Sequence, residues 1–240
     1  MRRARRPAIC NLYSLTPKRD HVGRFFRVSH NRTVAFEPVN TIFPRHVTPV
    51  VRQSEDGERE IVLMNWGFFR LEKGKAPRPV TNVRDDQART NPFWRDSFQK
   101  RRCLVPASCF CEPNGDVKPA TWHWFALKDG GDHRPLFAFP GIWRRYQGPV
   151  KKDGPNVNIE TYSFLTTTPN PLVATINHER MPVLLTREEE FQTWIGGTAD
   201  EAFALAREYP AERMAIVQEG YDKEDLLGGP PIEQRTATLL

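Results

Sequence analysis

Four side chains with catalytic potential lie far apart in this chain, each in a short polar segment. They are Cys10, Asn82, Glu112 and His178. A thiol is a nucleophile, a carboxyl and an imidazole transfer protons, and an amide orients a reacting group. We interpret the four as one site that the whole fold assembles. Each also has an ordinary alternative: a small buried side chain, a turn residue, a surface carboxylate and a hydrogen-bonded loop histidine, respectively.

A guanidinium stands two residues after the asparagine. In an extended strand Asn82 and Arg84 face the same way, because side chains alternate between the two faces. An amide beside a guanidinium suits a ligand that carries a carbonyl or an anionic group. This segment is therefore a candidate binding element, with turn chemistry as its alternative.

The other three cysteines do not form a metal-binding pattern. Cys103, Cys109 and Cys111 are separated by five residues and by one, whereas structural zinc sites use steps of two to four. The sequence has no phosphate-binding loop, nucleophile elbow or His-Glu-x-x-His pattern. We predict packing for these thiols, and neither a metal nor a cofactor.

The composition is typical of a cytoplasmic globular protein. Of 240 residues 39% are hydrophobic, and four cysteines are too few for a secreted disulfide scaffold. No apolar stretch follows the basic N-terminus as in a secretory signal, and no run reaches the ~20 apolar residues that span a bilayer. A transit peptide is the alternative for this Arg-rich start.

The net charge of +6 is concentrated at the N-terminus. Four arginines precede Cys10, so the rest of the chain is only mildly basic. Nucleic-acid binding then requires a local basic patch. Arg101-Arg102 and Arg144-Arg145 are the candidates, with solvated surface as their alternative.

The elements that must position these residues are short. Helices are predicted after Thr16-Pro17, after Asn91-Pro92, and at two capping-box patterns. These patterns begin at Thr186 and Thr198. Strands are predicted at residues 33–36, 48–51, 60–64, 103–112, 121–127, 136–143 and 162–167, with a hairpin turn at residues 55–58.

Many short strands with a few helices predict an α+β fold. We expect a single compact domain over residues 10–227, with a twisted, barrel-like mixed sheet and peripheral helices. Residues 1–9 are expected to be a leader that is removed or not translated, and residues 228–240 a flexible tail.

Six short motifs in order resemble the SOS response-associated peptidase (SRAP) family, whose members crosslink to abasic sites in single-stranded DNA. The resemblance spans residues 10 to about 220. Its residues are Cys10, Trp66-Gly67, Asn82-Val83-Arg84, Arg102 to Pro106 with Glu112, Phe139 to Trp143, and His178 to Pro182. The chain departs from the family pattern at Pro140, where alanine is usual, and lacks a tryptophan between Gly67 and Asn82 that some members place against the bases.

The resemblance implies a role for each matching residue. Cys10 is the nucleophile, Asn82 positions it and the sugar, and Glu112 and His178 are the acid/base pair. The implied DNA contacts are Arg84 and Arg180 on phosphates, Pro44 as a wedge, and Trp66 and Phe68. We expect a monomeric protein without membrane association, which binds single-stranded DNA with abasic sites and associates with the nucleoid when DNA is damaged.

The implied chemistry requires both the amine and the thiol of an N-terminal cysteine. The amine forms an imine with the abasic aldehyde, and the thiol closes a thiazolidine ring on the same carbon. An internal Cys10 has an amide nitrogen and cannot form the imine, so we expect the working protein to begin at Cys10. Two alternatives stay open: a cysteine (auto)peptidase that uses Cys10 and His178, and a non-covalent single-stranded DNA-binding module.

Overall fold

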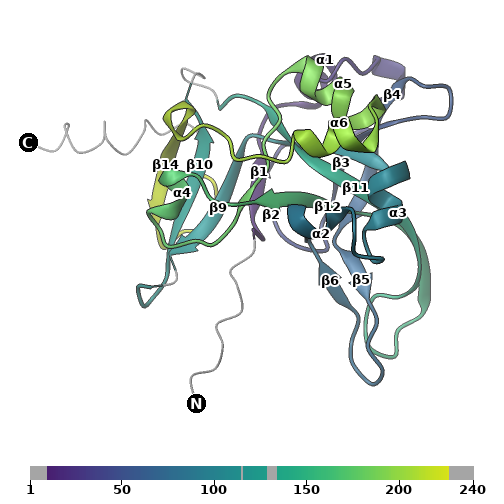
Figure 1. Ribbon diagram of the computed structural model, residues 1–240. Helices are drawn as coiled ribbons and strands as arrows, with labels where there is room; N and C mark the ends of the chain where they lie inside the picture. The colour runs from purple at the N-terminus through teal and green to yellow at the C-terminus, as the bar shows by residue number, and fades with distance from the viewer. Residues whose placement is uncertain (1–9, 115, 129–133, 227–240) are drawn as a thin grey trace, which may run out of the picture.

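A computed structural model describes residues 10–114, 116–128 and 134–226. It contains a closed five-stranded barrel beside a second, open sheet (Figure 1). The barrel is mixed, because β12 runs parallel to β4 while the other pairs of barrel strands are antiparallel. Pairing between β11 and β12 closes it. Its strands are β3 (Val47–Gln53), β4 (Arg59–Trp66), β8 (Arg102–Ala107), β11 (Phe137–Pro149) and β12 (Asn156–Thr167).

Two short strands extend the barrel along β12. They are β7 (Asn82–Arg84), which is parallel to β12, and β13 (Met181–Pro182). A hairpin of β5 (Phe68–Arg70) and β6 (Arg78–Val80) projects from the barrel at the bottom of Figure 1.

The second sheet is antiparallel, in the order β14-β10-β9-β1-β2. It lies on the left of Figure 1. Its strands are β1 (Tyr13–Leu15), β2 (Val39–Ile42), β9 (Cys109–Asn114), β10 (Thr121–Leu127) and β14 (Met214–Gly220).

The helices are short and lie at the periphery. α1, α5 and α6 gather at the top of Figure 1. The α-helices are α1 (Arg19–Phe25), α2 (Asp85–Ala88), α3 (Arg95–Lys100), α4 (Pro171–Ala174), α5 (Glu188–Gly196) and α6 (Ala199–Ala204). Two 3₁₀ turns cover His30–Arg32 and Ala211–Arg213. None of the helices in the described part of the chain is long and apolar enough to cross a membrane.

Aromatic side chains fill the core between the sheets. Tyr13 packs edge-on against Trp66 and Phe139, and its hydroxyl lies 2.6 Å from that of Tyr162. Thr48 joins these two hydroxyls, at 3.2 Å and 2.7 Å. Because each buried hydroxyl has a partner, these polar atoms do not weaken the core.

A buried ion pair attaches the last described segment to the second sheet. The carboxylate of Asp225 is fully buried and pairs with Arg134, and its Oδ2 accepts a hydrogen bond from Ser14 at 2.6 Å. The side chain of Arg134 is 10% exposed, and its Nη1 also lies 2.9 Å from the sulfur of Cys109.

The α+β class and the barrel-like core are confirmed. Strand β10 has the predicted bounds, and the predicted strands at 48–51, 60–64 and 162–167 lie within β3, β4 and β12. The turn at 55–58 and the helix capped by Thr198 are also confirmed. The predicted leader and tail lie outside the described residues.

Several boundaries were wrong. The run 103–112 is two strands rather than one: a bend at Ser108 sends β8 into the barrel and β9 into the second sheet. Residues 33–36 form no strand beyond a single bridge at Thr33.

The helix predicted after Thr16-Pro17 is α1, which starts at Arg19, after Lys18. The helix predicted after Asn91-Pro92 is α3, which starts at Arg95. The N-cap of α5 is Arg187, one residue later than the predicted Thr186, and its side chain makes no capping hydrogen bond. The carboxylate of Glu190 accepts from the backbone N–H of both Thr186 and Arg187, so it supplies the capping oxygen expected from Glu189.

Candidate active site

Cys10 and Glu112 are neighbours because their strands pair. β1 runs antiparallel to β9, and the backbone N–H of Cys111 donates to the carbonyl of Leu12 at 2.9 Å, which continues the pairing toward Cys10. The exposed fraction is 1% for Cys10 and 0% for Glu112. A thiol and a carboxyl are thus enclosed together where the segment before β1 lies beside β9.

Asn82 reaches the same place from the barrel. It lies in β7 opposite Phe164 of β12, and its Nδ2 donates to the backbone carbonyl of Cys10 at 2.6 Å. The same nitrogen donates to Oγ1 of Thr81 at 2.9 Å, and Thr81 donates to Asn11 at 2.9 Å. Amide and hydroxyl together hold the Cys10-Asn11 backbone against the barrel.

His178 completes the group from the loop between α4 and β13. Its Nε2 lies 3.1 Å from Oε2 of Glu112, and its Nδ1 lies 2.6 Å from the carbonyl oxygen of Arg180. Asn177 precedes it with a φ of 54°, a left-handed conformation that asparagine adopts more readily than most residues. This turn directs the imidazole inward, where only 3% of the residue is exposed.

The geometry of the ring fixes where its hydrogen lies. A carbonyl oxygen only accepts, so Nδ1 of His178 must be the donor to Arg180. Nε2 can then face the carboxyl of Glu112 favourably only with a proton between them. The two residues therefore share one dissociable proton, the property required of a general acid.

The electrostatics of the site agree with this arrangement. Burial lowers the pKa of His178, but the hydrogen bond and charge of Glu112 outweigh it, so the net pKa is raised above that of free imidazole. Burial, followed by the charge of Glu112, raises the pKa of the Cys10 thiol well above its ordinary value. The thiol at rest is neutral.

Buried polar atoms without a hydrogen-bond partner concentrate here. Besides the facing atoms Glu112 Oε2 and His178 Nε2, three such side-chain atoms lie at or beside the site: Asn82 Oδ1, Glu112 Oε1 and Arg180 Nε. Unpaired buried polar groups are costly and rare in folded proteins. Their grouping indicates a place prepared for a polar ligand.

The two predicted phosphate-binding arginines are held by acids. Arg84 is exposed and forms a bidentate pair with Asp86, at 3.0 Å and 2.8 Å. Arg180 is largely buried. Its Nη2 donates to Oδ1 of Asp85 at 2.6 Å and to the carbonyl of Thr166. Both lie beside the cluster, since Arg84 is in β7 and Arg180 follows His178.

Trp66 and Phe68 are the other two predicted DNA contacts. Both are fully buried. Trp66 stacks on Phe164 and donates from Nε1 to the carbonyl of Thr81 at 3.1 Å, so it supports the strand before Asn82. Pro44 is half-buried in the turn between β2 and β3, so part of its ring is accessible to a ligand.

Thr81, Asn11 and Asp85 were missed from the sequence. Each of the three is adjacent in the chain to a predicted site residue, and this adjacency was the signal that could have identified them. The described residues contain no group of three or more His, Cys, Asp or Glu side chains arranged to hold a metal.

The family model described as "SOS response associated peptidase (SRAP)" matches residues 9–219, nearly the whole of the described chain. The chain belongs to the SRAP family.

Two curated relatives come from Bacillus subtilis (strain 168). "Abasic site processing protein YoqW" is 31% identical over 173 residues, which cover 70% of each chain. "Abasic site processing protein YobE" is 28% identical over 178 residues, or 70% of this chain and 73% of that one.

Solved structures of two bacterial proteins share the fold. A Bordetella bronchiseptica protein superposes with a TM-score of 0.67 at 23% identity, over 86% of this chain and 97% of that chain. A Bacteroides thetaiotaomicron protein gives a TM-score of 0.68 at 23% identity, over 87% and 92%. At this identity these similarities concern the fold alone.

Proposed function

We propose that this protein processes abasic sites in single-stranded DNA by a covalent crosslink through Cys10. The observation that carries the proposal is the enclosure of Cys10 with Asn82, Glu112 and His178. The names of the curated SRAP relatives agree with the substrate class.

In the proposed reaction an amine and a thiol act on one carbon. The free amine of Cys10 attacks the aldehyde carbon of the ring-opened sugar and gives a carbinolamine. The Glu112–His178 pair donates its proton to the leaving hydroxyl and takes up the proton of the nitrogen, so water departs, the pair is restored and an imine remains. The sulfur then adds to the same carbon, and its proton passes to the nitrogen. The products are a thiazolidine ring and one water.

The neutral thiol favours this order of events. The amine of an N-terminal residue has an ordinary pKa near 7.7–8.0, so near neutral pH a fraction of it is an unprotonated nucleophile. The Cys10 thiol has a raised pKa and delivers its proton only as it adds. Amine attack therefore precedes ring closure.

The same features argue against a cysteine peptidase as the main activity. Such an enzyme lowers the pKa of its thiol with a neighbouring imidazole. Here the thiol pKa is raised, and Nε2 of His178 faces Glu112.

The proposal requires that the working protein begins at Cys10. In the given sequence nine residues precede it, and an amide nitrogen at Cys10 cannot form the imine. Removal of residues 1–9 by proteolysis, including self-cleavage beside Glu112, would release the amine.

The deciding experiment incubates the protein with a single-stranded oligonucleotide that contains one abasic site, followed by denaturing electrophoresis. Two forms are compared: the full chain, and a chain that begins at Cys10. We expect a stable adduct from the second form. The full chain should react only to the extent that intact mass shows loss of residues 1–9.

Substitutions at Cys10 separate the two bond-forming steps. In the form that begins at residue 10, Cys10→Ser and Cys10→Ala keep the amine but lose the thiol. Both should give an adduct only when borohydride traps the imine, whereas Cys10 itself needs no reductant. A full-length protein that retains Met1 and still forms the stable adduct would sink the proposal.

A further inference from the structure

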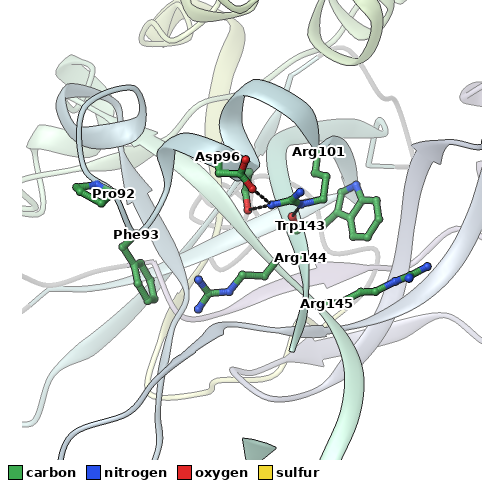
Figure 2. A pocket seen from close by; sticks show the side chains of 8 residues that line it. Pro92, Phe93, Asp96, Arg101, Trp143, Arg144 and Arg145 are labelled. Carbon is green, nitrogen blue, oxygen red and sulfur yellow. Dashed lines mark hydrogen bonds and ion pairs between the residues drawn. The ribbon is translucent and has the colours of Figure 1, made fainter. Parts of the chain in front are cut away.

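A second site lies outside the Cys10 cluster. It is an open pocket of about 580 Å³ beside α3 and β11, shown in Figure 2. Its lining includes Phe93, Asp96, Arg101, Trp143, Arg144 and Arg145. None of the four proposed catalytic residues contributes to it.

The central group of this pocket is the guanidinium of Arg144. It lies over the rings of Phe68 and Phe93, at 4.2 Å and 4.4 Å from their centres, and donates from Nη2 to the carbonyl of Phe69 at 3.2 Å. Figure 2 shows it extending toward Phe93, apart from the Asp96–Arg101 pair. No carboxylate in residues 10–114, 116–128 or 134–226 pairs with it. A guanidinium has five N–H donors, so the aromatic rings hold in place a cation with donors to spare.

The other charges of the pocket do not neutralise Arg144. The lone acid, Asp96, pairs with Arg101 and with Lys100. Arg145 is 3.8 Å from Glu160, which Arg52 already binds at 2.8 Å. Burial, with the positive charge of Arg101 and Arg70, lowers the pKa of Arg144 to about 10. A bound anion would relieve this excess of positive charge.

The β5–β6 hairpin continues the basic surface. Arg70 and Arg78 are directly opposed across the two strands and both are exposed, an arrangement of like charges that destabilises a hairpin. The guanidinium of Arg70 also lies 4.7 Å from the centre of the Phe93 ring, on which Arg144 lies. Glu72 on the same hairpin offsets part of this charge, and the hairpin and the pocket together form one patch with an excess of positive charge.

A short path of contacts joins this patch to the active site. Arg144 lies on Phe68, Phe68 pairs with Val80 of β6, and Val80 precedes Asn82 by two residues. With about 4.8 Å between strands and about 3.3 Å per residue, the pocket lies within roughly 20 Å of Asn82. A few nucleotides of single strand cover that distance.

We propose that the pocket binds a backbone phosphate of single-stranded DNA, a few nucleotides from the nucleotide that reacts with Cys10, with Arg144 as the principal donor. The inference rests on the proposed function for its choice of DNA as ligand. Because the stacked guanidinium is already ordered, binding loses little side-chain entropy.

The test measures reversible binding of undamaged DNA, so that no crosslink is involved. Full-length protein is titrated over a range of salt with oligonucleotides of about 16 and about 4 nucleotides. Arg144→Gln should weaken binding of the long oligonucleotide and reduce the slope of log K against log salt by about 0.7, the value for one phosphate on a single strand. The short oligonucleotide should lose less affinity, because it spans both sites only when it is fully extended.

Two further variants separate charge from structure. Arg144→Lys keeps the charge and should keep the salt slope. Arg24→Gln removes an exposed arginine from α1 and should change nothing. A wild-type slope in Arg144→Gln, or equal weakening for both oligonucleotides, would overturn the inference. A protein that shows these effects but never crosslinks abasic DNA would refute the proposed function and leave the phosphate site standing.

Discussion

The side-chain nitrogen of Asn82 donates to the backbone carbonyl oxygen of Cys10 at 2.6 Å. The donor belongs to the barrel extension and the acceptor to the segment that leads into the second sheet. This bond fixes the backbone of the nucleophile rather than its sulfur. In the proposed reaction the sulfur and the amine of Cys10 must both reach the aldehyde carbon of the sugar. The position of each depends on that backbone.

Loss of this bond should slow crosslinking more than it unfolds the protein. We expect Asn82→Ala to reduce the crosslinking rate about fivefold, since a hydrogen bond contributes about 1 kcal/mol. Asn82→Asp should be slower still, because its carboxylate cannot donate to the carbonyl. Rates are read from denaturing gels over time. Asn158→Ala, at an exposed position of β12, is the matched control, and a wild-type rate in Asn82→Ala would remove the positioning role.

Removal of the charge of Glu112 should make the Cys10 thiol more reactive toward an alkylating reagent. Burial and Glu112 raise the pKa of this thiol, and Glu112→Gln removes the second cause. Alkylation of native protein, followed by peptide mass spectrometry, should show faster modification of Cys10 in the variant. The buried thiol of Cys103 has a pKa raised by burial without a contribution from Glu112, so its rate should not change. Equal rates at Cys10 in both proteins would contradict the assigned contact.

The stability of the protein should depend on pH through His178. Its pKa is raised on folding, so its contribution is fully present below the ordinary imidazole value of 6.5 and is lost as the pH rises through the higher folded value. The free energy of unfolding, measured with denaturant, should fall over this window more in the wild type than in His178→Asn. Exposed His21 offers a control substitution. Parallel pH profiles for the wild type and His178→Asn would show that the charge of Glu112 does not stabilise the imidazolium.

Asp225→Asn should destabilise the fold by about 3–5 kcal/mol, because it leaves the charge of Arg134 buried without a counter-ion. Nη2 of Arg134 already lacks a partner, so no other group in the described residues compensates. Denaturant unfolding measures the loss. Asp56→Asn removes the acid of an exposed pair with Arg32 and should cost far less. Comparable losses in the two variants would show that burial of the Asp225 pair has no energetic consequence.

The sequence predicted those parts of the fold that local patterns determine. Strand β10 and the Thr198 cap follow from alternation and from a short capping pattern, both of which act over a few residues. The bend at Ser108 was missed, because residues 103–107 and 109–111 are apolar and a lone serine between them gives no local sign that the chain changes sheets.

The candidate site was predictable in membership but not in detail. Cys10, Asn82, Glu112 and His178 converge as the motif resemblance implied, since the motifs mark the segments that meet. The burial of Trp66 could not be predicted, because an aromatic residue at the end of a strand suits a core as well as a ligand surface, and its stacking partner Phe164 is distant in sequence. The acid partners of Arg84 and Arg180 likewise depend on geometry that a motif does not encode.

The bend at Ser108 also determines how the chain can be divided. Strands of the barrel alternate along the sequence with strands of the second sheet. The site takes Cys10 and Glu112 from the second sheet, and Asn82 and His178 from segments beside the barrel. No single cut separates a fragment with a complete sheet from one with a complete barrel. A split version of this protein would therefore be inactive as separate halves and would regain activity only when the two pieces fold together.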